Sequence, residues 1–219
     1  MNRLAIFDCD GTLVDSQANI CLAIEHCFAA ADLPAPSRDL SRRVVGLSLV
    51  EAMQALLPDA EEEFHRHLAE GYKRAFQDLR GSGRVDEPLY EGVAEAIDAL
   101  EADGWLLGVA TGKSDRGLAF CLEHHGLADR FVTLQTADRH PSKPHPSMIE
   151  AALAEAGADR AESMMIGDTS YDMLMAKAAG VSAVGVAWGY HSAEELLSAG
   201  ADFIAGRPSE LARLTKAIA

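Results

Sequence analysis

From residue 92 to the end of the chain, short apolar segments alternate with segments of helical periodicity, and this alternation constrains the fold more than any other feature. The apolar segments have the length of buried strands, and the segments between them repeat apolar residues every three or four positions. Strands and helices that alternate in this way form a parallel sheet, because each helix returns the chain across one face of the sheet. The predicted strands are 105–110, 131–134, 163–166, 182–187 and 202–204, and the predicted helices are 92–103, 114–125, 146–156, 170–179, 193–199 and 208–218.

The first part of the chain has a different pattern. Residues 4–7 are an apolar run that is typical of one more buried strand, whereas residues 16–85 show helical patterns and no strand signal. A helical segment of this size lies in the usual range for a domain. We therefore predict an α/β fold in which residues 1–15 and 86–219 form a Rossmann-like, three-layer core around a parallel sheet. Residues 16–85 form an inserted all-helical domain.

Two aspartates, Asp8 and Asp10, follow the apolar run at 4–7. If the extended backbone persists through Cys9, both carboxylates project from the carboxyl end of the strand, where open α/β sheets bind ligands. At about 4 Å and an effective dielectric of about 20, two such charges repel by roughly 4 kcal/mol, which favours a proton or a cation beside them. Mg²⁺ suits carboxylate oxygens and is often shared with substrate phosphates. An ordinary strand-end turn is the alternative interpretation, whereas a calcium loop requires glycine where Leu13 stands.

Two further candidate segments lie just before predicted helices. Thr111-Gly112-Lys113-Ser114 offers a hydroxyl and free amides to a phosphate oxygen at a helix start. The stretch that begins at Gly108 looks like a nucleotide P-loop, but it has three residues between its glycines where that motif has four. Lys143 lies in a loop that neighbouring prolines pre-order, and its ammonium also suits a phosphate. The alternatives are a plain turn with a serine cap and a solvated loop lysine.

Two more carboxylates follow the predicted strand at 163–166. Asp168 lies at the end of this strand, where it can complete the oxygen shell of an ion. Asp172 lies four residues later, near a helix start that favours negative charge. The alternative is an aspartate turn followed by a Ser170 cap. Because polar residues complementary to one phosphate and one cation would have to occur at four strand ends by chance, we favour the joint functional interpretation.

The composition limits what such a site can bind. The chain has 219 residues, 48% of them hydrophobic, which is enough for one sizeable core and a smaller added domain. The net charge of -15 repels nucleic acid and anionic membranes, so a negatively charged substrate needs a local positive pocket or a metal ion. We expect no signal peptide and no membrane span. Four cysteines without a C-x-x-C pattern fit a reducing cytoplasm, and Cys9 beside two carboxylates should have a raised thiol pKa, which argues against a nucleophilic role.

The stretch from Asp8 to Ser16, Asp-Cys-Asp-Gly-Thr-Leu-Val-Asp-Ser, matches the pattern D-x-D-G-T-L-x-D-S. Through this stretch the chain resembles the haloacid dehalogenase-like hydrolase superfamily. The resemblance implies that Asp8 is the nucleophile and Asp10 the general acid and base. An aspartate at the second position is found in the phosphatases and phosphomutases of that superfamily, but not in its dehalogenases or ion-pumping ATPases.

The other motifs of the superfamily are matched in the expected order: the second by Thr111 with Gly112, the third by Lys143, and the fourth by Gly167-Asp168 with Asp172. The insertion at 16–85 resembles the helical cap of the first cap class, so the resemblance covers essentially the whole chain. Trp188-Gly189-Tyr190 and Gly200-Ala201-Asp202 are similar to the phosphoglycolate phosphatase branch.

The resemblance implies a cytoplasmic, Mg²⁺-dependent phosphatase that hydrolyses a small, phosphoglycolate-like phosphate monoester through an aspartyl-phosphate. Its implied site residues are Asp8, the Asp10 carbonyl and Asp168 for the metal, Thr111, Gly112 and Lys143 for the phosphate, and Asp172 in support. The candidate substrate readers on the cap are Arg42 and Arg43, followed by Lys73 and Arg74.

Two alternatives remain on the same fold, a phosphomutase of the β-phosphoglucomutase type and a non-enzymatic regulatory binder. A binder has no need of a repelling pair of carboxylates, which favours an enzyme. We expect a monomer or homodimer whose partner is a small phosphorylated metabolite.

Overall fold

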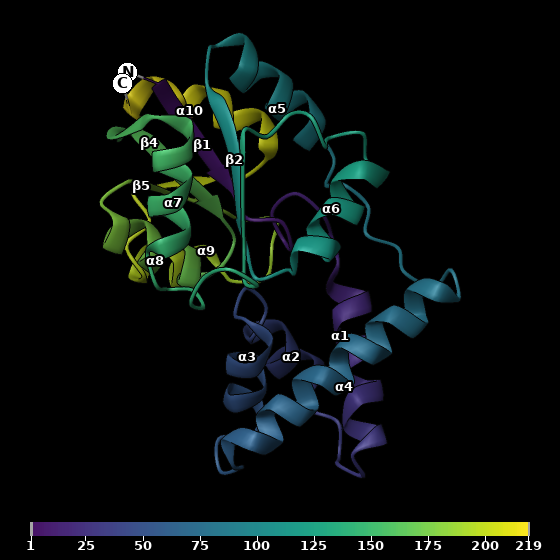
Figure 1. Ribbon diagram of the computed structural model, residues 1–219. Helices are drawn as coiled ribbons and strands as arrows, with labels where there is room; N and C mark the ends of the chain where they lie inside the picture. Colours follow the sequence, from purple (N-terminus) through teal and green to yellow (C-terminus); the bar gives the residue numbers. More distant parts are fainter. Residues whose placement is uncertain (1, 219) are drawn as a thin grey trace.

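The computed structural model describes residues 2–218, and its core is a six-stranded parallel sheet. The strands lie in the order β3-β2-β1-β4-β5-β6. Figure 1 shows helices on both faces of the sheet, which gives the three layers that the alternating pattern predicts. The prediction of an α/β, Rossmann-like fold is therefore confirmed. The strands are β1 (Asn2–Phe7), β2 (Leu106–Thr111), β3 (Thr133–Thr136), β4 (Ala158–Gly167), β5 (Ser182–Val186) and β6 (Phe203–Ala205).

Different helices cover the two faces of the sheet. One face packs against α5 (Val93–Ala102), α6 (Asp115–His124) and α10 (Leu211–Ile218), which the short 3-10 helix η1 (Pro208–Glu210) precedes. The other face packs against α7 (Ser147–Ala156), α8 (Ser170–Ala179) and α9 (Ala193–Ser198). Along β1, Ala5 and Phe7 belong to the first core, whereas Leu4 and Ile6 belong to the second, because successive strand residues point in opposite directions. A strand buried on both faces explains the continuous apolar run at the start of the sequence.

The chain between β1 and α5 forms a separate group of helices. These are α1 (Gln17–Ala30), α2 (Arg38–Arg43), α3 (Leu49–Leu56) and α4 (Glu62–Gly81), and we call them the helical lobe. The lobe has its own buried apolar cluster, which includes Ile24, Phe28, Met53 and Leu68. Figure 1 shows the lobe beyond the carboxyl edge of the sheet.

Two chain segments connect the lobe to the sheet, and they pair with each other. The Asp15 amide donates to the Pro88 carbonyl (2.9 Å), and the Tyr90 amide donates to the Leu13 carbonyl (3.0 Å). The entry and exit of the lobe therefore form one double connection rather than two independent ones.

The loop between α2 and α3 brings the lobe onto the sheet edge. The Ser48 amide donates to Ser142 Oγ (2.8 Å), and the Tyr171 hydroxyl donates to the Arg43 carbonyl (3.1 Å). A Cβ at Gly112 would lie 2.9 Å from the Leu47 carbonyl oxygen, so the close approach of the two backbones requires glycine at this position. The lobe consequently covers the edge at which the parallel strands end.

Some element boundaries differ from the predicted ones. The strand predicted at 131–134 lies at Thr133–Thr136, where Thr133 and Gln135 are buried and donate to the Glu155 carboxylate (2.5 and 2.8 Å). Apolar periodicity does not reveal a strand whose buried side chains are polar and paired. Within residues 2–218, no helix combines the length and the apolarity that crossing a membrane requires.

Candidate active site

Three parallel strands bring predicted site residues to one edge of the sheet. Phe7 of β1 lies beside Ile166 of β4 in the sheet register, and Asp8 and Asp168 follow these two residues closely in the chain. Thr111 is the last residue of β2, the other neighbour of β1. The sheet therefore delivers polar groups from three strands to its carboxyl edge, as open α/β sheets do at ligand sites.

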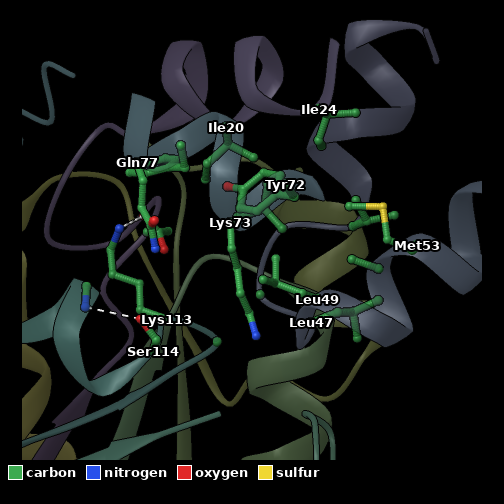
Figure 2. Close-up of a pocket in the computed structure, with 18 of the residues that line it drawn as sticks. Ile20, Ile24, Leu47, Leu49, Met53, Tyr72, Lys73, Gln77, Lys113 and Ser114 are labelled. Carbon is green, nitrogen blue, oxygen red and sulfur yellow. Dashed lines mark hydrogen bonds and ion pairs between the residues drawn. The ribbon is translucent and has the colours of Figure 1, made fainter. Parts of the chain in front are cut away.

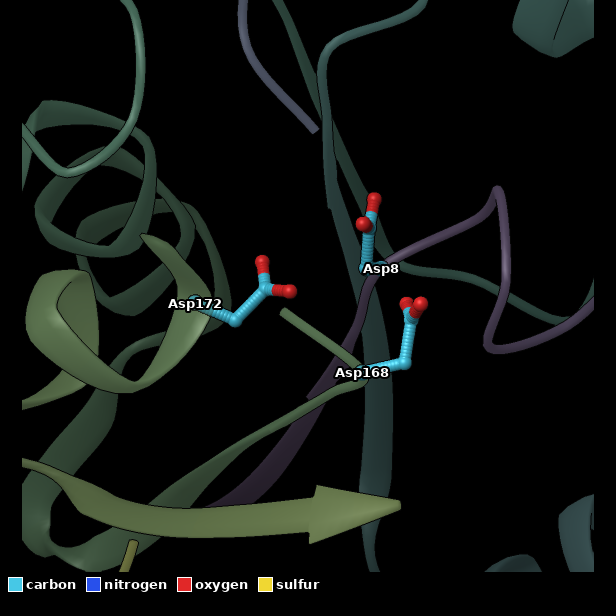
Figure 3. Close-up of side chains that lie close together, drawn as sticks. All are labelled: Asp8, Asp168 and Asp172. Atoms are coloured by element: carbon cyan, nitrogen blue, oxygen red, sulfur yellow. The ribbon is translucent and has the colours of Figure 1, made fainter. Parts of the chain in front are cut away.

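Asp8, Asp168 and Asp172 form a buried acidic cluster, shown in Figure 3. One carboxylate oxygen from each residue lies within 4.8 Å of the others, and none of the three residues is more than 1% exposed. Carboxylates this close repel one another, and burial removes the water that would screen them. The cluster therefore requires positive charge.

Lys143 supplies one such charge. Its side chain is fully buried, and its Nζ lies 2.9 Å from Asp8 Oδ1 and 2.7 Å from Asp172 Oδ1. Burial lowers the pKa of the ammonium, but the carboxylates of Asp172 and Asp8 outweigh burial and the net shift is upward. Lys143 is charged in this site, and the alternative of a solvated loop lysine is wrong.

Asp172 is fixed beside Lys143 by the start of α8. Thr169 is the N-cap of this helix, and its amide (3.0 Å) and hydroxyl (2.7 Å) both donate to Asp172 Oδ2. This arrangement is a capping box, in which the capping residue and the third helical residue bond each other. The alternative of a Ser170 cap is therefore wrong, and both oxygens of Asp172 have partners.

Asp168 is fixed by two segments that are far apart in the sequence. Its Oδ1 accepts from the Thr12 hydroxyl (2.8 Å), and its Oδ2 accepts from the Tyr190 amide (2.9 Å). A Cβ at either Gly11 or Gly189 would collide with the Asp168 carboxylate, and Gly11 also has a φ of +84°. Glycine at these positions makes room for the carboxylate.

Asp8 is the least committed carboxylate of the acidic cluster. Its Oδ1 accepts from the Cys9 amide (2.6 Å) and from Lys143, whereas its Oδ2 is buried and has no hydrogen-bond partner among the described residues. The pKa of Asp8 is raised to about 7. Burial is the largest cause, Lys143 acts in the opposite direction, and the charges of Asp172 and Asp10 add to the rise. Burial, followed by the charges of Asp8 and Asp172, also raises the pKa of Asp168 well above its usual range.

The acidic cluster fits a hard divalent cation. It sets three carboxylates against one ammonium, so negative charge is left without a counter-charge. The candidate ligand atoms are all oxygens, the type that Mg²⁺ prefers, and Asp8 Oδ2 has uncommitted lone pairs. Two residues of the predicted metal set, Asp8 and Asp168, belong to this cluster, whereas the Asp10 carboxylate does not.

Asp10 has separate surroundings because β1 ends before it and the chain turns after Cys9, whose carbonyl accepts from the Leu13 amide. The condition for parallel projection of the two aspartates, an extended backbone through Cys9, is therefore not met. Asp10 Oδ1 instead accepts from the Ser16 hydroxyl and lies 2.8 Å from Lys113 Nζ. Asp8 and Asp10 thus lie beside different lysines.

The segment after β2 combines a helix cap with a free amide. Ser114 caps α6 by accepting from the Gly117 amide (3.1 Å), as the alternative interpretation of this segment requires. The buried Thr111 hydroxyl accepts from the Lys113 amide (3.2 Å), while the Gly112 amide has no partner in the described part of the chain. The cap therefore coexists with an amide that can bind an anion.

Comparison with known proteins decides the family. The sequence model of the haloacid dehalogenase-like hydrolase family matches residues 5–186, a range that contains the acidic cluster, Asp10 and Lys143. The chain belongs to the haloacid dehalogenase-like hydrolase family. The predicted resemblance and the prediction of an enzyme of the hydrolase class are thus confirmed.

This hydrolase has relatives of nearly the same length. The probable phosphatase IndB of Dickeya dadantii is 36% identical over 214 residues, which cover 96% of this chain and 92% of the relative. A phosphoglycolate phosphatase of Vibrio parahaemolyticus is 30% identical over 219 residues, which cover 95% and 94%. The crystal structure of a "predicted phosphatase" from Clostridium acetobutylicum superposes with a TM-score of 0.89 at 26% identity and covers 99% of both chains.

The hydrolase contains a charge network around Asp10 that the sequence analysis misses. Lys113 Nζ lies 2.8 Å from Glu87 Oε1 as well as from Asp10 Oδ1, and Glu87 pairs with Arg80 of α4 (3.4 Å). Burial lowers the pKa of Lys113, but the neighbouring acids, led by Asp10, raise it by more, so the net shift is upward. The position of Lys113 directly after Gly112, and that of Ser16 at the end of the first motif, were available signals. No motif marks Glu87.

A cavity of 380 Å³ lies between the lobe and the sheet edge of the hydrolase, and Figure 2 shows part of its lining. Asp10, Gly112 and Lys113 line its core side. Of the predicted substrate readers, Lys73 lines the cavity, but Arg42, Arg43 and Arg74 do not. Arg42 pairs with Asp39 (3.5 Å) and Arg43 with Glu195 (3.3 Å).

Cys9 has a raised thiol pKa, as predicted, but the main cause differs. The largest contribution is a hydrogen bond with Cys121, whose Sγ lies 3.8 Å from that of Cys9, and burial is the second. The charge of Asp10 contributes less than either. The thiol is therefore a buried packing group of the hydrolase.

Proposed function

We propose that this protein is a Mg²⁺-dependent phosphatase that hydrolyses a small phosphate monoester through an aspartyl-phosphate on Asp8. The observation that carries the proposal is the buried acidic cluster with its single lysine, in which Asp8 Oδ2 has no partner within residues 2–218. Such a group is costly to bury unless it serves a ligand or a reaction.

Mg²⁺, held by Asp8, Asp168 and the Asp10 carbonyl, would supply charge neutralisation for the transferring phosphoryl group. Lys143, the Gly112 amide and the Thr111 hydroxyl would hold its remaining oxygens as a preorganised anion site. Asp172 is the positioning residue for Lys143, because it bonds the ammonium and is itself fixed by the capping box.

The reaction balances with two aspartates and one water. A carboxylate oxygen of Asp8 attacks phosphorus, the bond from phosphorus to the leaving oxygen breaks, and Asp10 gives that oxygen a proton. Water then attacks the phosphorus of the aspartyl-phosphate while Asp10 takes a proton from it, which releases inorganic phosphate and restores Asp8. General acid and base help of this kind is worth roughly 10²–10⁴-fold.

The helical lobe acts in this proposal as the cap over the site, with residues 16–85 as the inserted domain and residues 1–15 and 86–219 as the core. It covers the carboxyl edge and contributes part of the cavity lining. Closure of such an element excludes water from the first transfer, and opening releases the product. The four free, buried cysteines are in keeping with a cytoplasmic location.

The test is phosphate release from a panel of phosphate monoesters that includes phosphoglycolate, with Mg²⁺, with EDTA, and with Mg²⁺ restored. We expect release that EDTA abolishes and Mg²⁺ restores. Release that EDTA leaves unchanged would remove the metal from the proposal, and no release from any ester would remove the phosphatase. A hexose phosphate in the panel distinguishes a phosphomutase, which would form an isomeric sugar phosphate without releasing inorganic phosphate.

A further inference from the structure

The lobe side of the 380 Å³ cavity is lined mainly by apolar side chains, and its residues with polar groups are Tyr72, Lys73, Gln77 and Arg80. Its walls come from α1, α3 and α4, and Figure 2 shows several of these side chains around the open space. The apolar residues that form most of this wall are Ile20, Ile24, Leu49, Met53, Tyr72 and Phe76. Apolar walls bind apolar ligand surface and offer no partners to hydroxyl or carboxylate groups.

The cavity lies on the side of the site where the leaving group must be. Asp10, the proposed proton donor to the leaving oxygen, lines the cavity together with Gly112, whereas the acidic cluster does not. A phosphoryl group bound at Asp8 and Lys143 therefore directs the rest of the ester towards the lobe. The volume falls in the range of about 300–1,000 Å³ typical of pockets that bury drug-sized ligands, which is far more than the two-carbon glycolate group needs.

The lining also carries polar side chains, and the charged groups nearest Asp10 are paired with one another. Within the described residues, the Tyr72 hydroxyl, Gln77 and Arg116 have no hydrogen-bond or ion-pair partner. Lys113 is bound by Asp10 and Glu87, Arg80 by Glu87, and Lys73 by Glu70 (2.7 Å). A leaving group rich in hydroxyls, such as a hexose, would leave several hydrogen bonds unmade against this wall. The mainly apolar lining therefore favours an apolar leaving group over a small acid or a sugar.

We infer that the substrate of this site is a phosphate monoester whose leaving group is an apolar, ring-sized body. This inference rests on the proposed function for the identity of the reacting group. Burying a phenyl-sized group in such a pocket is worth about 10- to 100-fold in an equilibrium constant. The preference should enter kcat/KM through binding, because the ring is remote from the reacting atoms.

The experiment compares ethyl phosphate with phenethyl phosphate, whose leaving oxygens are both primary alkoxides. It also measures binding of propyl phosphonate and phenylpropyl phosphonate, which cannot be hydrolysed, by calorimetry in the presence of Mg²⁺. We expect the ring to raise kcat/KM and to lower Kd by about 10- to 100-fold. Equal values for the two members of each pair, or a higher kcat/KM for phosphoglycolate than for phenethyl phosphate, would overturn the inference.

A pair of variants locates the effect. Leu49→Trp adds bulk to the lining, and it should reduce the advantage of phenylpropyl over propyl phosphonate by at least about fivefold. Gln54→Trp makes a comparable addition on the exposed side of the same helix, outside the lining, and should leave the ratio unchanged. A ratio that Gln54→Trp reduces as much as Leu49→Trp would contradict the assignment. If no ester is hydrolysed but the ring still tightens phosphonate binding, the proposed function fails while the assignment of the cavity to an apolar, ring-sized group stands.

Discussion

The acidic cluster at the sheet edge and the apolar wall of the helical lobe both belong to the proposed site. They differ in how many polar atoms they contain and in whether those atoms have hydrogen-bond or ion-pair partners. In the cluster, nearly every polar atom has a named partner, and the exception, Asp8 Oδ2, is the atom that the chemistry needs. The lobe wall is lined mainly by apolar side chains, and the specificity that we propose for it lies in shape and apolar area. The difference shows how one fold can keep a fixed reaction and change its substrate, since the lobe can vary without disturbing the cluster.

The largest expected effect is on the cluster side and comes from Asp8→Asn. The amide keeps the shape but is a poor nucleophile, so phosphatase activity should fall by more than about 10⁴-fold. The same change removes one of three mutually repelling buried charges, so the metal-free protein should unfold at an equal or higher temperature. Steady-state kinetics and thermal unfolding measure the two effects.

The matched control is Asp15→Asn, which changes an exposed aspartate of the same motif outside the cluster. It should leave both quantities nearly unchanged. Substantial residual activity in pure Asp8→Asn protein would show that another group attacks the phosphate.

The second effect comes from Lys143→Met, which leaves the buried Asp8 and Asp172 without their shared cation. Breaking a buried pair by removing one partner costs about 3–5 kcal/mol, so we expect marked destabilisation in urea and loss of most activity. Lys177→Met makes the same substitution in the exposed pair with Asp202 and should cost less than about 1 kcal/mol. Equal losses for the two variants would mean that the cluster is not held by its lysine.

The third effect concerns the boundary between cluster and lobe, where Lys113 joins Asp10 to Glu87. Lys113→Met should lower kcat by about 10²-fold, because Asp10 loses the group that positions it for proton transfer. KM for a small ester should change much less than kcat. Glu87→Gln keeps Lys113 in place and should have a smaller effect of the same kind. A variant whose KM rises while kcat is unchanged would make Lys113 a substrate-binding group instead.

The same two regions differ in how far the sequence predicts them. The strand pattern places Asp8 and Asp168 at the carboxyl edge, because parallel strands can end only at a common edge, and the motifs identify the loop that carries Lys143. Local sequence patterns do not predict the pairing of Lys143 with Asp172, since it depends on how two loops meet in space. The turn after Cys9, which separates Asp10 from Asp8, is likewise set by bonds that strand periodicity does not describe.

In the lobe, the sequence predicts even less of the site. Helical periodicity predicts which side chains of α1 and α3 are buried within the lobe, but it does not predict how the lobe is rotated relative to the sheet. That rotation decides that Tyr72 and Lys73 line the cavity while Arg42 and Arg43 do not. Positive charge on the predicted cap is therefore a weak guide to substrate contacts, because tertiary packing selects which side chains face the site.

A smaller effect tests the electrostatics of the cluster through pH. The pKa of Asp8 is raised to about 7 in the metal-free protein, so its contribution to stability is fully present below the unfolded value near 3.8 and is lost as pH rises through about 7. Bound Mg²⁺ must displace this proton at low pH but not at high pH. We therefore expect the rise in unfolding temperature on adding Mg²⁺ to be larger at pH 8 than at pH 5.5. A rise that is equal at both pH values, or unaltered in Asp8→Asn, would remove Asp8 from the metal site.

The smallest effect belongs to the lobe side and comes from Arg43→Ala. Arg43 of the lobe pairs with Glu195 of α9. Both side chains are substantially exposed, so the pair contributes about 0–1 kcal/mol. The bond from the Tyr171 hydroxyl ends on the Arg43 backbone carbonyl and survives the substitution. We therefore expect kcat/KM for phosphoglycolate and phenethyl phosphate to change by less than about fivefold. A tenfold rise in KM for one ester alone would mean that Arg43 reads the substrate after all, and the apolar wall would then share its role with a charged rim.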